Sequence, residues 1–144
     1  MPTDSSTTPV PPRFEISSDP ARLDVDLIHR FLSSSYWAAG RSLEVVERSI
    51  RHSLCFGVYG EHGQVGFARV ITDRAVFAYL ADVFILPEYR GQGLSKALVR
   101  TILAHHDLQG LMVFLLRTRD AHGLYAQFGF QPIANPQELM GRYR

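Results

Sequence analysis

Near the start of the chain, apolar residues recur with helical spacing in two successive segments. From Asp24 to about Ser34 they fall three or four residues apart, as they do along one face of a helix. The pattern returns after Ser42, a residue typical of a helix N-cap, and it ends near Ser53. The sequence therefore predicts two consecutive amphipathic helices, each with one buried face.

Shorter apolar runs separated by turn residues follow, and they are typical of strands. A hairpin is predicted over 54–71, with its strands joined by the four-residue connection 60–63. A long strand over 76–86 is then followed by a helix from Leu94 to about His106. The remaining predictions are a short first strand at 14–16, a buried strand from Leu111, a helix around Tyr125 and a last strand from Phe130. This order predicts a mixed α+β fold.

Length and composition limit the classes of protein that this chain can represent. The 144 residues are enough for one domain, predicted over 13–144, after a disordered tail over 1–12 that is rich in Ser, Thr and Pro. A net charge of +1 with no cluster of Lys and Arg argues against a nucleic-acid partner. No apolar stretch is long enough for a membrane span, and the first residues lack the pattern of a signal peptide. The single cysteine, Cys55, allows no internal disulfide, which agrees with a cytoplasmic location.

The junction between the long strand and the helix at Leu94 carries the main indication of function. Gly91 and Gly93 allow the backbone to approach a ligand closely and to aim successive N–H groups at it. A helix that begins beside them adds free N–H donors and the positive end of its dipole. Arg90 adds a fixed positive charge with forked donors. These features predict a phosphate or pyrophosphate site; the alternative is an ordinary strand-to-helix turn with a surface arginine.

Two well-known phosphate-binding patterns do not fit this loop. The P-loop pattern G-x-x-x-x-G-K-[ST] fails, and so does the dinucleotide pattern, because Lys96 stands where its third glycine would be. The segment does resemble R-x-x-G-x-[GA], the acetyl-CoA pyrophosphate loop of the GNAT superfamily of N-acetyltransferases. The matching residues are Arg90, Gly91, Gln92, Gly93, Leu94 and Ser95, with Ser in place of the usual Gly or Ala. The resemblance implies that these residues and Lys96 bind acetyl-CoA.

A second segment strengthens the resemblance. Residues 121–130 are similar to the superfamily's A-x-x-x-Y-x-x-x-G-F signature, a short helix with Asp120 as its expected N-cap, followed by a strand. In that family the matching tyrosine, here Tyr125, lies near the thioester sulfur and protonates the departing thiolate. A phenol of pKa about 10 can donate to a thiolate whose parent thiol has a pKa of about 8.5, with cysteine as the model. The alternative is a half-buried tyrosine with its hydroxyl bonded to the backbone.

The resemblance also implies the fold and the geometry of the cofactor site. A central mixed, mostly antiparallel sheet is expected, with six to seven strands and about four flanking helices. In that family the fourth and fifth strands splay apart, and pantetheine lies in the gap between them. Backbone groups of Val83, Phe84 and Ile85 would then pair with the pantetheine, and an N–H there would stabilise the tetrahedral oxyanion.

A general base and a substrate-binding loop are further predictions. Asp82 is the candidate base, since a carboxylate within an apolar run must be paired, solvated or shifted in pKa. Strand alternation can point it away from the site, an ion pair with an arginine is the main alternative, and water-mediated deprotonation is equally open. The loop with Tyr36, Trp37 and Arg41 is expected to bind the acceptor amine, where Trp37 suits a cation–π contact. The alternative for Trp37 is a core-capping role between the two helices.

The predicted function is transfer of the acetyl group of acetyl-CoA to a primary amine of a small molecule or protein, by direct attack in a ternary complex. One alternative is a CoA-binding regulatory or sensor domain without catalysis. Another is a transferase using a different acyl-CoA, such as succinyl-CoA if Arg41 or Arg69 reaches the acyl end. The six histidines show no ligand spacing, so no metal is expected. The resemblance also suggests a homodimer.

Overall fold

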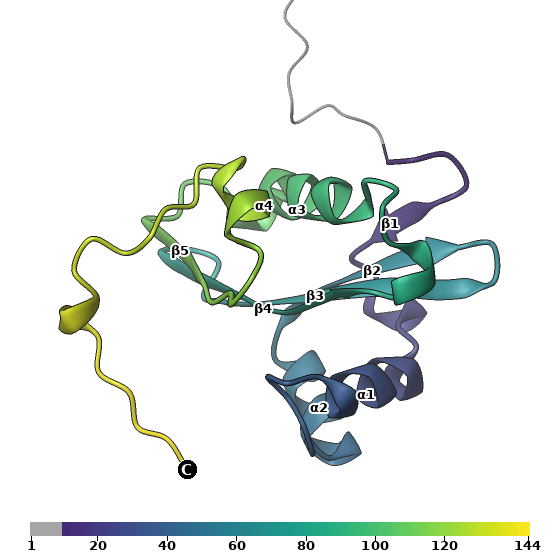
Figure 1. The fold of residues 1–144 in the computed structure, drawn as a ribbon, viewed down its shortest axis with the longest axis horizontal. Helices are drawn as coiled ribbons and strands as arrows, with labels where there is room; N and C mark the ends of the chain where they lie inside the picture. The colour runs from purple at the N-terminus through teal and green to yellow at the C-terminus, as the bar shows by residue number, and fades with distance from the viewer. Residues whose placement is uncertain (1–9) are drawn as a thin grey trace, which may run out of the picture.

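The computed structural model describes residues 10–144, and it shows a five-stranded sheet with helices on both faces (Figure 1). Most of the predicted tail, residues 1–9, lies outside the described part. Among the described residues, no helix has the length and apolar character needed to cross a membrane. The helices and strands are, in chain order, β1 (Glu15–Ser17), α1 (Val25–Ser34), α2 (Leu43–Arg51), β2 (Leu54–Gly60), β3 (Gly63–Thr72), β4 (Phe77–Ile85), α3 (Leu94–Ala104), β5 (Val113–Leu116) and α4 (His122–Ala126).

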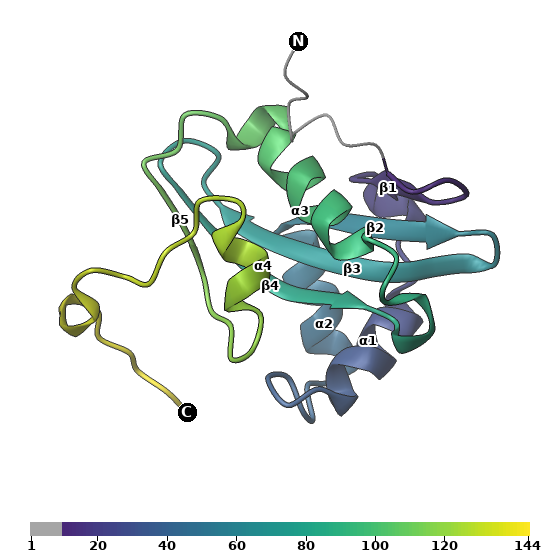
Figure 2. The same cartoon turned by 45° about the horizontal axis from the view of Figure 1, so that its top comes forward.

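The five strands lie side by side in their sequence order, from β1 to β5. Neighbouring strands are antiparallel except for β4 and β5, which run parallel and are connected through α3. One face of the sheet is covered by α1 and α2, and the other by α3 and α4 (Figures 1 and 2). This is the mixed, mostly antiparallel α+β arrangement with four helices that the sequence predicted.

The parallel pair β4 and β5 is bonded over only part of its length. The register runs from Phe77 opposite Val113 to Leu80 opposite Leu116, where β5 ends. Beyond Leu80, β4 continues to Ile85 with only β3 paired to it. The last part of β4 therefore has no parallel partner, at the end of the strand where the family resemblance implied a splay between the fourth and fifth strands.

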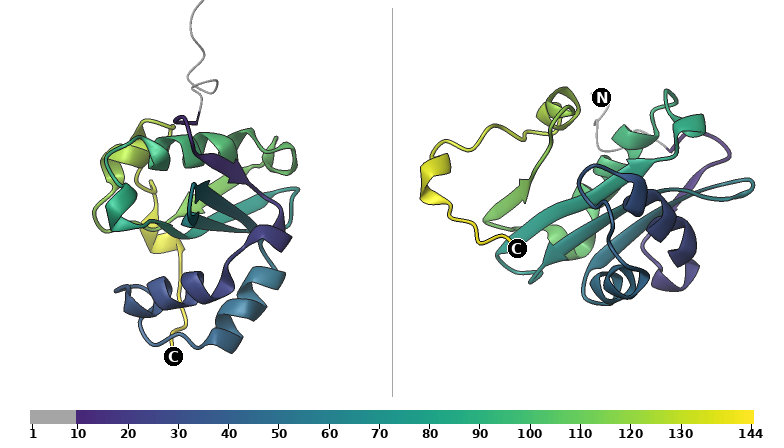
Figure 3. Two further views of the ribbon diagram at one scale, coloured as in Figure 1. Left: turned by 90° about the vertical axis from the view of Figure 1, so that its right-hand side faces the viewer. Right: turned by 60° about the horizontal axis from the view of Figure 1, so that its bottom comes forward.

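The prediction of six to seven strands was wrong, because the described residues contain five. The strand expected from Phe130 is absent from them. The chain after α4 is irregular except for a 3-10 turn at Pro136–Glu138, and Figure 3 shows it leading away from the sheet. Pro132 and Pro136 have no N–H to donate to a neighbouring strand, so only short stretches on either side remain for pairing.

Short polar side chains define where the helices begin. Asp24 and Ser42 each accept a hydrogen bond from an N–H in the first turn, of α1 and of α2 respectively. Ser42 is therefore the N-cap that the sequence predicted. The start of α4 differs from the prediction, because its N-cap is Ala121 and not Asp120. There Thr118 Oγ1 accepts a hydrogen bond from the Ala121 N–H, and no side chain caps the first turn of α4.

Two apolar cores lie on opposite faces of the sheet. The larger one joins the sheet to α3 and α4 and includes Phe56 and Leu98, which are almost completely buried. The smaller one lies under α1 and α2 and includes Ile28, Phe67 and Phe84. Burying one such side chain stabilises the fold by roughly 1.5–3 kcal/mol. The strands between the two cores are thus fixed from both sides.

Candidate functional site

Two glycines in the left-handed region shape the turn between β4 and α3. After Ile85 the chain forms a 3-10 turn at Pro87–Tyr89, and Gly91 and Gly93 then each have a φ of 81°. Any other L-residue would lose about 1–2 kcal/mol in this conformation. A Cβ on either glycine would meet no atom within 4 Å, so the constraint is the backbone conformation and not a lack of space. The turn therefore leaves room in front of its backbone.

The helix α3 begins at this turn with its first N–H groups uncapped. Gly93 is the N-cap residue, and it offers no side-chain acceptor. Ala97 N–H donates to the Gly93 carbonyl, and the amides of the first turn before Ala97 have no helical acceptor. The first turn also contains no acidic residue. The positive end of the helix dipole is thus open to an anion from outside the chain.

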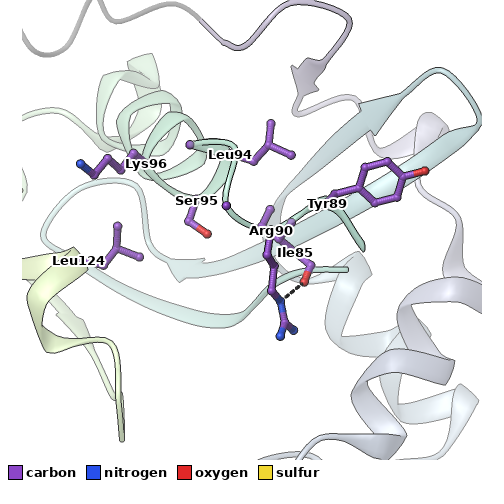
Figure 4. Close-up of a pocket in the computed structure, with 9 residues that line it drawn as sticks. Ile85, Tyr89, Arg90, Leu94, Ser95, Lys96 and Leu124 are labelled. Carbon is purple, nitrogen blue, oxygen red and sulfur yellow. Dashed lines mark hydrogen bonds between the residues drawn. The ribbon is translucent and has the colours of Figure 1, made fainter. Parts of the chain in front are cut away.

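An open cavity of about 450 Å³ lies at the start of α3, as Figure 4 shows. This volume falls in the range of roughly 300–1,000 Å³ that is usual for small-molecule sites. Its lining comes from the end of β4, the glycine turn, the first turn of α3 and one residue of α4: Ile85, Tyr89, Arg90, Gly91, Gly93, Leu94, Ser95, Lys96 and Leu124. Most of the predicted cofactor-binding residues therefore surround one cavity.

The rim of the cavity is basic. Arg90 and Lys96 are both exposed there. Arg90 Nε donates a hydrogen bond of 2.9 Å to the Ile85 carbonyl, which ties its guanidinium to the end of β4 (Figure 4). Gln92, also predicted to bind the cofactor, is exposed in the turn but is not part of the lining, and its side-chain amide is 3.4 Å from the Tyr89 carbonyl. Two positive charges, of which that of Arg90 is held in place, therefore lie beside the uncapped helix.

The side chains of Val83 and Phe84 point into the two cores and not into the cavity. Phe84 stacks on Phe31 of α1, with ring centroids 4.0 Å apart, in the smaller core. Val83 packs against the larger core on the opposite face. The prediction for these two residues concerned their backbone groups alone, and it stays a prediction.

Tyr125 lies on α4 directly after Leu124, which lines the cavity. Its side chain is buried in the larger core and meets Phe130 edge-on, with ring centroids 6.0 Å apart. Burial raises the pKa of the Tyr125 phenol above its usual value of 10.0, and the nearby Tyr36 raises it further. The phenol is therefore protonated at neutral pH and able to act as a proton donor.

Asp82 has an almost fully buried carboxylate, with 2% of the side chain exposed. Arg41 donates to its Oδ2 at 2.8 Å, and Arg69 donates to the same oxygen at 2.9 Å. Trp37 Nε1 donates to Oδ1 at 3.0 Å. The structure thus brings the candidate base together with two of the three residues predicted to bind the acceptor. The ion pair named as the alternative for Asp82 is present, with two arginines instead of one.

Tyr36 and Trp37 form the exposed end of a row of aromatic rings. Trp37 lies 6.4 Å from Phe31 and 5.2 Å from Tyr36, measured between ring centroids, and Phe31 is the residue stacked on Phe84. The guanidinium of Arg119 lies over the face of Tyr36, 3.6 Å from its centroid. The loop between α1 and α2 therefore touches both β4 and the segment that precedes α4.

The identities of the partners of Asp82 and Tyr36 were not anticipated from the sequence. A charged residue inside an apolar run signals a buried partner, yet the partners of Asp82 lie 13, 41 and 45 residues away from it. No local pattern marks Arg69, Arg41 or Trp37 as those partners. Arg119 is one of two arginines in the irregular segment between β5 and α4, and nothing in its neighbourhood along the chain points to Tyr36.

Comparison with known proteins gives a consistent set of relatives. Residues 51–132 match the family model described as an acetyltransferase (GNAT) domain. A predicted acetyltransferase of Gibberella zeae is 34% identical over 131 residues, which represent 74% of this chain and 73% of that protein. GCN5-related N-acetyltransferase 2, chloroplastic, of Arabidopsis thaliana is 34% identical over 82 residues, which span 55% of this chain and only 30% of that protein.

A solved structure agrees with these relatives over nearly the whole chain. The crystal structure of a predicted acetyltransferase of the GNAT family from Xanthomonas campestris pv. campestris superimposes with a TM-score of 0.90 and is 56% identical. The match covers 92% of this chain and 94% of that chain.

Proposed function

Because the chain belongs to the GNAT family of acetyltransferases, we propose that it transfers the acetyl group of acetyl-CoA to a primary amine of a small molecule or a protein. The amine attacks the thioester directly in a ternary complex, so no acyl-enzyme forms. The observation that carries this proposal is the cavity at the uncapped start of α3. Free amides beside Arg90 and Lys96 match the chemistry of a pyrophosphate, which is an anion with many acceptor oxygens.

The residues around the cavity offer partners for the separate parts of acetyl-CoA. The turn and first helical residues, 90–96, would hold the pyrophosphate through their amides and the two basic side chains. The end of β4 beyond Leu80 has no β5 beside it, so one edge of its backbone is available. Backbone groups of Val83, Phe84 and Ile85 would pair with the pantetheine along this edge, which brings the thioester toward α4.

Tyr125 is the proposed general acid. As the amine nitrogen bonds to the thioester carbon, the C–S bond breaks and the sulfur leaves as a thiolate. The Tyr125 phenol donates its proton to this thiolate, and burial, which raises its pKa, keeps that proton in place at neutral pH. Tyr125 directly follows the cavity-lining Leu124 in α4, and this short distance along the chain supports the proposed role.

The attacking nitrogen must also lose a proton, and Asp82 was the sequence-based candidate to accept it. Arg41 and Arg69 both donate to Oδ2, and Trp37 donates to Oδ1. These contacts favour the other route left open by the sequence, in which a water molecule carries the proton to solvent. The same contacts argue against succinyl-CoA as the acyl donor, because Arg41 and Arg69 are paired with Asp82 and neither is free to bind a succinyl carboxylate. Acetyl-CoA is therefore the proposed donor.

The first test is calorimetric titration with acetyl-CoA, CoA and succinyl-CoA. Micromolar binding of acetyl-CoA is expected for the unchanged protein and loss of binding for Gly93→Asp, because a carboxylate at the N-cap would accept the helix amides and repel phosphate. Gly110→Asp is the matched control: Gly110 also has a left-handed φ and open space around it, but it does not line the cavity. Equal affinity in all three proteins, or no binding of any CoA, would refute the proposed site.

Turnover separates an enzyme from a CoA-binding sensor. Release of the CoA thiol is measured with a panel of amines: spermidine, L-lysine, glucosamine and a lysine-containing peptide. Acetylation of at least one acceptor class is expected, with mass spectrometry of the product as confirmation. Tight CoA binding with no turnover across a wide panel would favour the sensor. The homodimer, the cytoplasmic location and the absence of nucleic-acid and membrane partners stay predictions.

A further inference from the structure

The carboxylate of Asp82 connects three parts of the chain that are distant in sequence. Trp37 and Arg41 reach it from the loop between α1 and α2, and Arg69 reaches it from β3. Arg69 Nη1 also donates to Ser53 Oγ at 3.2 Å, so Arg69 is itself anchored near the end of α2. Asp82 therefore holds the loop that contains Tyr36 and Trp37 against the middle of the sheet.

The backbone at Asp82 has an unusual conformation, which affects the face of the sheet opposite to its carboxylate. Its φ is +56°, in the left-handed region, and β4 has one more residue than β3 at this point. Phe67 pairs with Phe84 and Arg69 with Ala81, so three steps along β4 match two along β3. Such a bulge interrupts the alternation of side chains between the two faces.

The bulge decides which face each following side chain occupies. Before it, Ala78 and Leu80 face the larger core beside α3. After it, Ile85 faces that core and the cavity, while Phe84 faces the smaller core beneath α1. One residue thus directs the end of β4 toward the cofactor side and holds the acceptor loop on the other side.

We propose that Asp82 is a positioning residue, which fixes the loop with Tyr36 and Trp37 and thereby sets how tightly the acceptor amine binds. The proposal rests on the acetyltransferase function in so far as it speaks of an acceptor. Asp82 acts through Trp37 and Arg41 and takes no proton from the substrate. This role of Asp82 extends the proposed function, because a residue that the acceptor does not touch then controls how tightly the acceptor binds.

The geometry of the carboxylate supports positioning over proton transfer. Each carboxylate oxygen has two lone pairs that accept hydrogen bonds. Both on Oδ2 are used by Arg41 and Arg69, and one on Oδ1 is used by Trp37. The remaining lone pair belongs to a side chain that is 2% exposed, so a substrate amine does not reach it. Two guanidinium groups around one carboxylate also leave the cluster with a net positive charge, which disfavours an incoming ammonium.

Fluorescence of Trp37 reports the position of the loop without any ligand, because the chain contains a single tryptophan. Asp82→Asn keeps the size of the side chain and tolerates the left-handed φ, but it removes the charge that holds both arginines. Its Trp37 emission is expected to shift to longer wavelength, with iodide quenching about twofold stronger, because the loop loosens. Asp107→Asn is the matched control, since Asp107 also pairs with an arginine, Arg74, away from the loop.

A second variant keeps the test valid if Asp82→Asn does not fold. Arg41→Gln removes the contact from the loop side and leaves the pair of Asp82 with Arg69 intact. It is expected to move the Trp37 emission and quenching in the same direction as Asp82→Asn. If either folded variant leaves both fluorescence readouts as they are in the unchanged protein, the proposal is overturned.

Steady-state kinetics with the best amine of the panel give the second readout. For Asp82→Asn, the acceptor KM is expected to rise about 10-fold while kcat stays within about threefold and the Kd for acetyl-CoA is unchanged. A loss of kcat of about 100-fold or more at an unchanged acceptor KM would instead identify Asp82 as the base and overturn the proposal. The fluorescence measurement involves no CoA and no amine. A failure of the acetyltransferase function would therefore appear in the titrations or the turnover assay, and a failure of Asp82 as a positioning residue would appear in the fluorescence.

Discussion

Replacing Gly93 by alanine isolates the contribution of the left-handed backbone in the glycine turn. Gly93 has a φ of +81°, and an added Cβ meets nothing within 4 Å, so no steric overlap with the surroundings accompanies the change. The left-handed conformation then accounts for the whole effect, about 1–2 kcal/mol of lost stability. For a domain of this length, that corresponds to a fall in Tm of roughly 4–8 °C.

The matched control is the same substitution at Gly123 in α4. An added Cβ at Gly123 also meets nothing within 4 Å, but the φ of Gly123 is not in the left-handed region. Alanine in a compatible conformation restricts the unfolded chain and is expected to add about 0.4–1 kcal/mol of stability. The two variants should therefore differ by about 1.5–3 kcal/mol, with changes of opposite sign relative to the unchanged protein.

Urea unfolding followed by circular dichroism measures both free energies, and thermal scans give the two Tm values. If Gly93→Ala is as stable as Gly123→Ala, the φ at Gly93 is not held in the left-handed region and the account of the turn is refuted. Thermal scans with added acetyl-CoA extend the comparison of the two variants. Acetyl-CoA is expected to raise the Tm of Gly123→Ala as much as that of the unchanged protein, and to raise that of Gly93→Ala less.

Three further predictions follow from single residues. Tyr125→Phe removes the proposed proton donor, so kcat measured by thiol release should fall about 100-fold or more while the acetyl-CoA Kd from calorimetry stays the same; full turnover would exclude the role. The backbone N–H of Val76 and those of its two neighbours lower the pKa of the Asp73 carboxyl. Asp73→Asn should therefore lower the free energy of unfolding at pH values above the unfolded pKa of about 3.9. In urea titrations, the difference from the unchanged protein should vanish as the pH falls through the lowered pKa of the folded state, and a difference that persists in acid would contradict this. Burial raises the pKa of the Cys55 thiol to about 12, so its reaction with DTNB at pH 8 should be on the order of 10³-fold slower in the native protein than in urea, and fast native labelling would show that the thiol is accessible.

The parts of the molecule that depend on near neighbours in sequence were predictable. The N-cap Ser42, the helix after Gly93 and the left-handed glycines of the turn follow from residues within a few positions of one another. The cavity at the start of α3 forms largely from that same segment, so most of its lining could be named from the sequence. In that segment, the residues that give the cavity its chemistry also determine its backbone shape.

The parts that depend on distant neighbours were not predictable. The arginines and the tryptophan around Asp82 come from β3 and from the loop before α2, and only the folded sheet brings them to one carboxylate. The expected strand from Phe130 failed for a different reason. The pattern of the family signature favoured a strand, and the two prolines that follow it removed the N–H groups that a strand needs.

The bulge at Asp82 divides β4 into two segments of opposite phase. The extra residue matters because an uninterrupted strand would carry the alternation of the first segment through to Ile85. Phe84 would then turn from its stack on Phe31 toward the side of the cavity, and Ile85 would turn toward α1. Deleting the extra residue would remove the bulge and leave those two side chains on their present faces. Straightening the bulge with all its residues retained would instead exchange the two faces of the segment that leads into the glycine turn.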